Sequence, residues 1–383
     1  MRKKHFVRAG AILTVLALCA LLSAPVQAAA RASHINSHST DATTSINANV
    51  YLTTQMMQPM FQNSISQQIP QIVGNAIAST VNQLPKQDQG WAAQMANALL
   101  QPSATLLSLT PEKGGLLATL KVSLYPGDPR PTTTGILIGF SVTNPTTIQV
   151  TALPAANGSQ GVVSGPLTTF QVPIGTLNSI AATPNCGDAD LSINLKFPIS
   201  LGQASSQNAT NPMPVAYTNV AAPMAAATSF TNVTAPAADP ASYVEIPASS
   251  LAQLGSSMGT LPISSSLTAQ NIRVGVSGSN LTATSDIYWY GLDIGTAVST
   301  LAPGAASGNL VVHVVNTNLQ ILGGLISFPM NSYNQQVEQM LNAKLNGALT
   351  GKFTVTQAAI GGNSHLSCAG SNSLVLGGTL VLG

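Results

Sequence analysis

Apolar residues recur every three or four positions in two long segments of the chain, which is the spacing of a helix with one buried face. These segments are 55–84 and 333–349, and each predicts a long amphipathic helix. A shorter helix is predicted at 91–100. Proline removes a backbone donor from a helix, so Pro59 and Pro70 are expected to interrupt or kink the first one.

Elsewhere apolar and polar residues alternate, which is the period of a strand with one buried face. The clearest alternation is at 191–201, where Pro198 indicates an edge or a bulge. Further strands are predicted at 116–124, 135–142, 147–153, 271–276, 281–289, 309–316, 353–359 and 374–382. Strands and helices do not alternate as they do around a parallel sheet. The predicted fold class is therefore α+β, with a curved antiparallel sheet wrapped around long amphipathic helices.

Changes in composition divide the chain into five segments. Residues 1–28 are interpreted as a signal peptide, and the polar residues 29–48 as a flexible tether. Residues 49–201 and 243–383 are two halves, each with helix and strand patterns. The Ala/Pro/Thr-rich stretch 202–242 between them is interpreted as a linker or insert.

The first 28 residues have the layout of a secretory signal peptide. Arg2, Lys3, Lys4 and Arg8 form a basic start, an uncharged and mostly apolar run follows at 9–22, and a small-x-small cleavage pattern ends at Ala28. The run is shorter than the ~20 residues that a membrane-spanning helix needs. We expect a protein that is secreted or extracytoplasmic in the cell envelope; a retained anchor is the alternative.

Charged residues make up only 6% of the chain, against about 25% in an average domain. The sequence has 13 Lys+Arg and 11 Asp+Glu, and four of the basic residues lie in the signal segment, which leaves 13 − 4 = 9 basic residues. No basic patch remains that could neutralise several phosphates, which argues against a nucleic-acid partner. Groups for acid–base chemistry are scarce, and no zinc-site spacing or serine-hydrolase elbow occurs. We expect a non-catalytic protein without a cofactor or metal.

Two cysteines follow the signal segment, Cys186 and Cys368, and both lie in loop-like sequence. An even pair in an oxidising compartment predicts a disulfide. The alternative is two buried, inert thiols.

A resemblance to a known family rests on the segment 271–349. A strand pair and a glycine-punctuated crossover are followed there by Gly308-Asn309-Leu310-Val311-Val312-His313-Val314, by Leu322-Gly323-Gly324-Leu325, and by a helix that begins near Tyr333. This order is similar to the TULIP-like phospholipid-binding proteins that Gram-positive and related bacteria secrete. The resemblance implies a sheet that wraps a helix and leaves an apolar groove for lipid acyl chains. It implies no catalytic residues.

The expected ligand is therefore a phospholipid or other acyl lipid, bound at the cell envelope, with peripheral membrane contact. The groove is expected to be lined from the last helix and the central strands, by Ile287, Trp289, Leu310, Val312, Val337, Met340 and Leu341. Trp289 is also a candidate core residue. The alternative function, favoured by the uncharged Ser/Thr/Asn surface and the insert at 202–242, is a structural or surface-interaction protein without a ligand.

Overall fold

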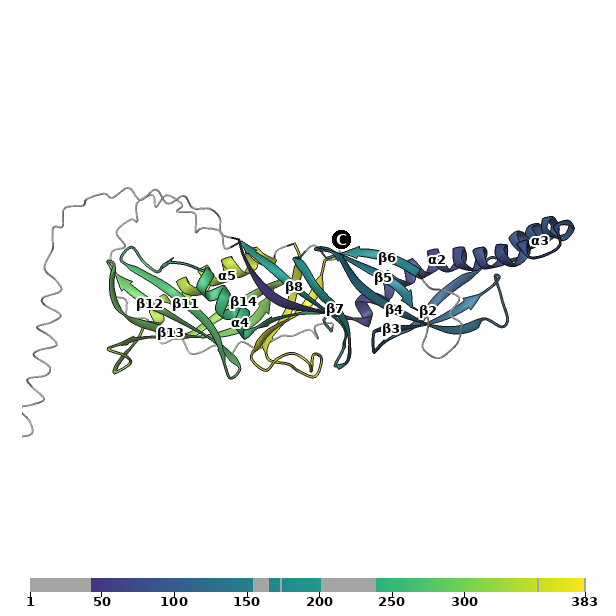
Figure 1. Ribbon diagram of the computed structural model, residues 1–383. Helices are drawn as coiled ribbons and strands as arrows, with labels where there is room; N and C mark the ends of the chain where they lie inside the picture. Colours follow the sequence, from purple (N-terminus) through teal and green to yellow (C-terminus); the bar gives the residue numbers. More distant parts are fainter. Residues whose placement is uncertain (1–42, 154–164, 173, 201–238, 350, 382–383) are drawn as a thin grey trace, which may run out of the picture. The chain divides into compact units, whose positions relative to one another are not determined.

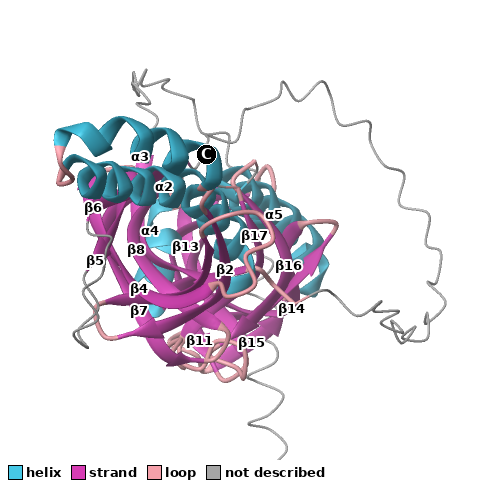
Figure 2. Ribbon diagram, turned by 90° about the vertical axis from the view of Figure 1, so that its right-hand side faces the viewer, coloured by secondary structure: helices cyan, strands magenta, loops and turns pink. Residues whose placement is uncertain are grey.

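The computed structural model describes residues 43–153, 165–172, 174–200, 239–349 and 351–381 (Figure 1). They belong to one compact unit, 41–383. The predicted signal peptide and most of the predicted tether and linker lie outside the described residues. Three antiparallel sheets make up most of the structure, with 55% strand and 23% helix. Figure 2 shows this predominance of strand.

The prediction of a sheet wrapped around long amphipathic helices is wrong. Helices α3 (Lys86–Leu99), α4 (Ala248–Ser257) and α5 (Asn334–Leu349) have 14, 10 and 16 residues. Helix α2 (Thr54–Asn82) is longer and continues through both of its prolines. Among its side chains that the structure describes, Met57, Phe61 and Ile65 near its start are the buried ones. Further along, α2 lies beside α3, and none of its described side chains is buried there.

One sheet is a simple meander in chain order. Its strands are β2 (Ser103–Glu112), β3 (Gly115–Ser123), β4 (Thr132–Asn144), β5 (Thr147–Leu153) and β6 (Gly165–Gln171). Helix α2 lies along its edge strand β2. The Gln62 side chain of α2 accepts a hydrogen bond from Leu106 N at 2.6 Å and donates one to Ala104 O at 3.2 Å. A side-chain amide of the helix thus replaces a neighbouring strand at this edge.

The second sheet joins the two halves of the chain in the order β16-β17-β9-β1-β8-β7. Its strands are β1 (Thr43–Thr53), β7 (Thr176–Cys186), β8 (Ala189–Ser200), β9 (Ser242–Pro247), β16 (Phe353–Ile360) and β17 (Ser373–Leu380). Strand β1 begins inside the expected tether, so that prediction is wrong from Thr43 onward. The reason is visible in β1 itself, because buried Ile46, Ala48, Val50 and Leu52 alternate with polar residues.

The third sheet follows chain order from β10 to β15. Its strands are β10 (Leu261–Pro262), β11 (Leu267–Ser277), β12 (Asn280–Trp289), β13 (Leu292–Ala306), β14 (Asn309–Ile321) and β15 (Ile326–Pro329). Helix α4 packs on β11 and helix α5 on β14, with a short 3-10 helix, η1 (Asn331–Tyr333), just before α5 (Figure 1). We call the face of this sheet that α4 and α5 cover its inner face.

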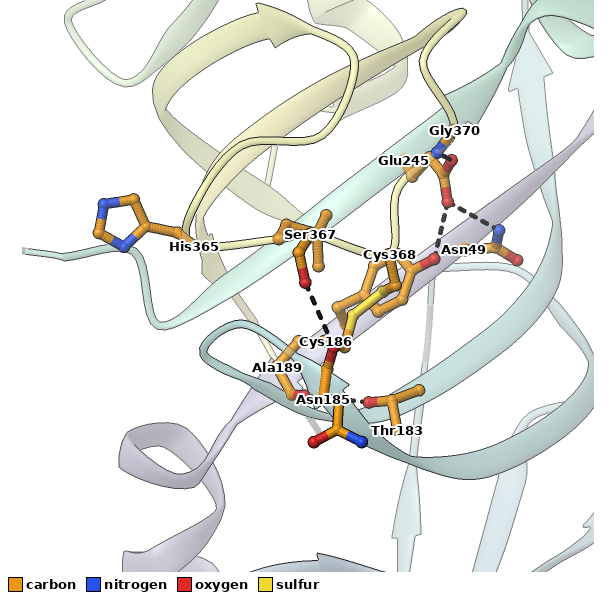
Figure 3. Close-up of a disulfide and its surroundings, with 12 residues drawn as sticks. Asn49, Thr183, Asn185, Cys186, Ala189, Glu245, His365, Ser367, Cys368 and Gly370 are labelled. Carbon is orange, nitrogen blue, oxygen red and sulfur yellow. Dashed lines mark hydrogen bonds between the residues drawn. A yellow bond between two sulfur atoms is a disulfide. The ribbon is translucent and has the colours of Figure 1, made fainter.

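The disulfide between Cys186 and Cys368 is confirmed, with a Cα–Cα distance of 4.9 Å (Figure 3). It ties the turn between β7 and β8 to the loop between β16 and β17. Gly187 has φ +73°, and a Cβ there would lie 2.5 Å from His365 O, so this close approach requires glycine. Beside it, His365 Nδ1 lies 2.7 Å from Asp188 Oδ2, and this hydrogen bond raises the pKa of His365.

Candidate functional site

An entirely apolar cavity of about 50 Å³ lies where the second sheet, the inner face of the third sheet, α4 and α5 meet. Eighteen residues line it and none is polar. The second sheet contributes Ile46 and Ala48 from β1, Phe197 from β8, Val244 and Ile246 from β9, and Leu374 and Leu376 from β17. These residues are two apart within each strand, so the period of two aims all of them at the cavity.

The third sheet and the two helices close the cavity from the other side. The sheet contributes Val274, Leu281, Leu301, Leu310 and Val312, and the helices contribute Leu251, Leu254, Met258, Leu341, Leu345 and Leu349. Helix α4 approaches β11 closely at Gly255, where a Cβ would lie 2.7 Å from Val274 N. Glycine at this position lets the helix pack directly on the strand.

A second cavity of about 50 Å³ continues along the inner face of the third sheet. Its wall includes Ile287 of β12, Ala297 of β13, Val337 of α5 and Met330. Its hydroxyl-bearing residues are Ser285, Ser299, Thr317 and Tyr333. Leu341 lines both cavities, so this one side chain of α5 stands between them.

A row of side chains on helix α5 forms hydrogen bonds with the backbone of β14, as a neighbouring strand would. Strand β14 pairs with β13 on one side, but on the other side β15 pairs only with 318–321. The open backbone of Leu310 is met by Asn346, which accepts from the N–H at 3.0 Å and donates to the carbonyl at 2.8 Å. Asn342 does the same for Val312, at 2.7 and 3.2 Å. Each amide therefore satisfies both groups of one edge residue.

The same row continues toward the start of α5. Glu338 Oε2 accepts from Val314 N at 3.2 Å, and Asn334 Nδ2 donates to Val314 O at 3.3 Å. Glu338 Oε2 also lies 2.8 Å from Nδ1 of His313, whose side chain is largely exposed. We call Asn334, Glu338, Asn342 and Asn346 the edge clamp. Their spacing of four residues places them on one face of α5.

Five of the seven predicted site residues line one or both of the two cavities. Leu310 and Val312 line the first cavity, Ile287 and Val337 line the second, and Leu341 lines both. Trp289 lines neither; it is half-buried at the end of β12, with its ring 5.2 Å from that of Tyr290. The side chain of Met340 lies outside what the structure describes. Sequence reasoning missed α4 and the walls from β1, β9 and β17 as parts of the site, although Leu251 and Leu254 had the spacing of one helix face.

A buried carboxyl group is the other notable polar feature. Glu245 of β9 is 5% exposed and accepts hydrogen bonds from Tyr51 OH at 2.7 Å, Asn49 Nδ2 at 3.0 Å and Gly370 N at 2.8 Å. Figure 3 shows the carboxyl group between Asn49 and Gly370, near the disulfide. Because its partners come from β1 and the β16–β17 loop, Glu245 holds that loop to the sheet, which is a structural role.

Two neighbouring tyrosines offer a matched test of that role. Tyr51 pairs with Tyr243 across β1 and β9, but the buried Tyr243 hydroxyl has no hydrogen-bond partner. We expect Tyr51→Phe to lower the free energy of unfolding by about 2 kcal/mol, because it removes a bond to a carboxylate. Tyr243→Phe should leave it unchanged or raise it by about 1 kcal/mol. Urea unfolding of both variants measures this, and equal losses would contradict it.

Burial raises the pKa of both hydroxyls. For Tyr51, burial acts first and the Glu245 hydrogen bond second, and for Tyr243 burial raises the pKa to about 12. A folded-state pKa above the ordinary value of 10.0 means that the folded protein holds the proton more tightly. The contribution of these two hydroxyl groups to folding stability is therefore fully present below pH 10, and it is lost as the pH rises above that value.

The chain has no match among family models or among curated proteins. Within the described ranges, no three His, Cys, Asp or Glu side chains gather in a way that could hold a metal ion. None of the described helices combines the length and the apolar character needed to cross a bilayer. The candidate site therefore rests on its geometry, an apolar cavity and a mainly apolar one that share Leu341.

Proposed function

We propose that the protein is a non-catalytic, extracytoplasmic binding protein for an acyl lipid, held between the third sheet, α4 and α5. The observation that carries the proposal is the first cavity, whose eighteen lining residues are all apolar. Protein interiors are packed with few voids larger than a water molecule. Ligand sites are typically concave and lined mainly by apolar side chains. The two cavities beside α5 are therefore places where the core of this protein is not fully packed.

The cavity size determines what must move. A cavity of about 150 Å³ lined by apolar residues holds one benzene molecule, whereas each cavity here has about 50 Å³. An acyl chain therefore needs the two cavities to merge and widen. Rotation of Leu341 joins them, and an outward shift of α5 widens both, because α5 contributes Val337, Leu341, Leu345 and Leu349 to the walls.

Helix α5 is suited to such a shift because much of its attachment is polar. The edge clamp provides hydrogen bonds that water can replace, each worth about 1 kcal/mol net. The apolar contacts that α5 gives up can be replaced by contacts with the acyl chain. Binding then replaces apolar contacts of α5 with apolar contacts of the acyl chain. The hydrogen bonds of the edge clamp that are lost set the free-energy cost.

The disulfide is consistent with the proposed location, since such bonds persist in oxidising compartments. The signal-peptide pattern at 1–28 supports export. The alternative of a structural envelope protein without a ligand predicts cavities that never open, so a direct binding experiment separates the two.

Filling the first cavity should block the ligand. Ala48 of β1 is buried in the cavity wall, and Ala48→Val adds two carbon atoms there. We expect a free energy of unfolding higher by about 1 kcal/mol, and at least tenfold weaker binding of a fluorescent fatty acid. Fluorescence titration and urea unfolding measure the two effects.

Ala181→Val is the matched control, because Ala181 is exposed on β7. It makes the same chemical change in a strand and should leave fatty-acid binding unaltered. Native mass spectrometry of the unaltered protein mixed with palmitate and with phosphatidylcholine identifies the class of ligand. An absence of any bound acyl species at saturating concentration would reject the proposal.

A further inference from the structure

Large apolar side chains crowd one end of the third sheet. Leu325 is 85% exposed and Leu322 69%, both in the turn between β14 and β15. Phe328 and Ile326 of β15 are also exposed, and so are Tyr290 and Leu292 at the turn between β12 and β13. We call these six residues the apolar tip. Exposed apolar clusters of this kind mark interaction surfaces.

Strand register shows that the two turns are neighbours. Strand β13 pairs with β14 through Thr296 and Gln320, directly before the turn at Leu322. The same end of β13 pairs with β12 through Leu292 and Trp289. Both turns therefore lie at the same end of adjacent hairpins.

The apolar tip is continuous with the inner face that lines the second cavity. Residues paired across antiparallel strands point to the same face. Phe328 pairs with Leu319, which pairs with Ala297 in the cavity wall. Ile326 pairs with Ile321, so a second apolar row starts beside the first. Neither of these rows contains a charged residue.

Backbone conformation at the turns is unfavourable for the residues found there. Tyr290 has φ +48° and Leu322 φ +53°, a left-handed region that bulky residues rarely adopt. Glycine or asparagine would relieve that strain. Both side chains are exposed, so neither repays the cost by filling the core. Strain of this kind is found at functional sites.

The charge of the patch indicates the type of partner. The stretch 321–330 contains no charged residue, and 288–293 contains only Asp293, which accepts a hydrogen bond from Gly295 N. Without cations the patch has no attraction for anionic headgroups. The six residues of the apolar tip are joined in these two turns by the half-buried Trp289. They fit a lipid bilayer, where Trp and Tyr favour the interface.

We propose that the apolar tip inserts into the surface of an uncharged lipid bilayer, with Trp289 and Tyr290 at the headgroup level. Leu322, Leu325 and Phe328 then enter the acyl region, and the two apolar rows connect the bilayer to the second cavity. The route to the cavity rests on the proposed function, whereas the membrane contact does not.

The protein contains two tryptophans, Trp91 and Trp289, which allows a local test. In the full chain with Trp91→Phe, only Trp289 emits, and vesicles of phosphatidylcholine with brominated acyl chains should quench it. In the chain with Trp289→Phe, the exposed Trp91 of α3 emits and should not be quenched. Quenching depends on contact, so binding through another segment of the chain does not produce the expected result.

Variants then test the tip itself. Leu322→Ser with Leu325→Ser should lower partitioning into vesicles about 100-fold, at roughly tenfold for each leucine. Met95→Ser with Leu99→Ser, two exposed apolar residues of α3, is the control and should change the partitioning less than twofold. Raising the salt concentration should also change it less than twofold.

Three results would overturn the proposal. They are quenching of Trp91 in place of Trp289, equal effects of the two serine pairs, and tip-dependent dimers in sedimentation without vesicle binding. The last would assign the patch to a second copy of the chain. Fatty-acid binding in solution is measured on the same tip variant, and its retention with loss of vesicle binding separates this surface from the cavity.

Discussion

Removing the disulfide, with Cys186→Ser and Cys368→Ser together, is expected to lower the free energy of unfolding by about 5 kcal/mol. The two cysteines are 182 residues apart in sequence. A cross-link that closes so long a loop removes much of the entropy of the unfolded chain, and the gain grows with the logarithm of loop length. That amount is a large share of the 5–15 kcal/mol by which native domains are stable.

Guanidinium unfolding without reductant measures this loss. The unaltered protein with reductant is the control, and it should unfold at the same midpoint as the double variant. A single variant, Cys186→Ser, should behave like the double one, because either change opens the loop. A loss below about 1 kcal/mol would contradict this expectation and would point to residual structure that already restricts the unfolded chain.

Releasing the edge clamp, with Asn342→Ala and Asn346→Ala together, is expected to undock α5. Each asparagine satisfies the N–H and the carbonyl of one residue of β14. Their removal leaves partly buried backbone groups without these partners, at about 2 kcal/mol for each residue. Alanine favours the helix itself, so a loss of α5 docking cannot be assigned to helix propensity.

Hydrogen exchange is the direct measurement. The amides of Leu310 and Val312 should lose protection by nearly 1,000-fold, the equivalent of about 4 kcal/mol, and fatty-acid association should become faster. Gln335→Ala with Gln339→Ala is the control, because both residues are exposed on α5. Unchanged protection at Leu310 and Val312 in the asparagine variant would show that the apolar side of α5 alone holds it in place.

The alternation of apolar and polar residues predicted nine of the seventeen strands that the structure describes. It also failed in particular places. Strand β13 was missed because Gly295, Ala297, Ser299 and Pro303 occupy inward or bulged positions that elsewhere hold large apolar side chains. Small residues fit a closely packed inner face, but they are not strongly apolar. The strand therefore shows no clear alternation of apolar and polar residues. Strand β1 was missed for its many Ser, Thr and Asn residues.

Five of the seven predicted site residues line the cavities. Alternation marked the buried face of β12 and β14, and a spacing of three or four residues marked that of α5. Trp289 was placed in the groove by the same pattern, since it is two residues beyond Ile287. Strand β12 ends at Trp289. Alternation predicts on which side of a strand a side chain lies, but it does not predict how far that side chain is from the cavity. The walls from β1, β9 and β17 could not be found, because nothing local shows which distant strands meet.

What the sequence alone determined is local: where about half of the strands and three of the helices lie, which of their faces is apolar, how little charge the chain carries, and that Cys186 and Cys368 can pair. These follow from the periods of two and 3.6 residues and from residue chemistry. The tertiary structure alone decided that β1 pairs with both β8 and β9, that the open edge of β14 is covered by side-chain amides of α5, and that two voids remain at Leu341. Strand order, register and packing volume depend on contacts between residues far apart in the chain, which no local pattern encodes.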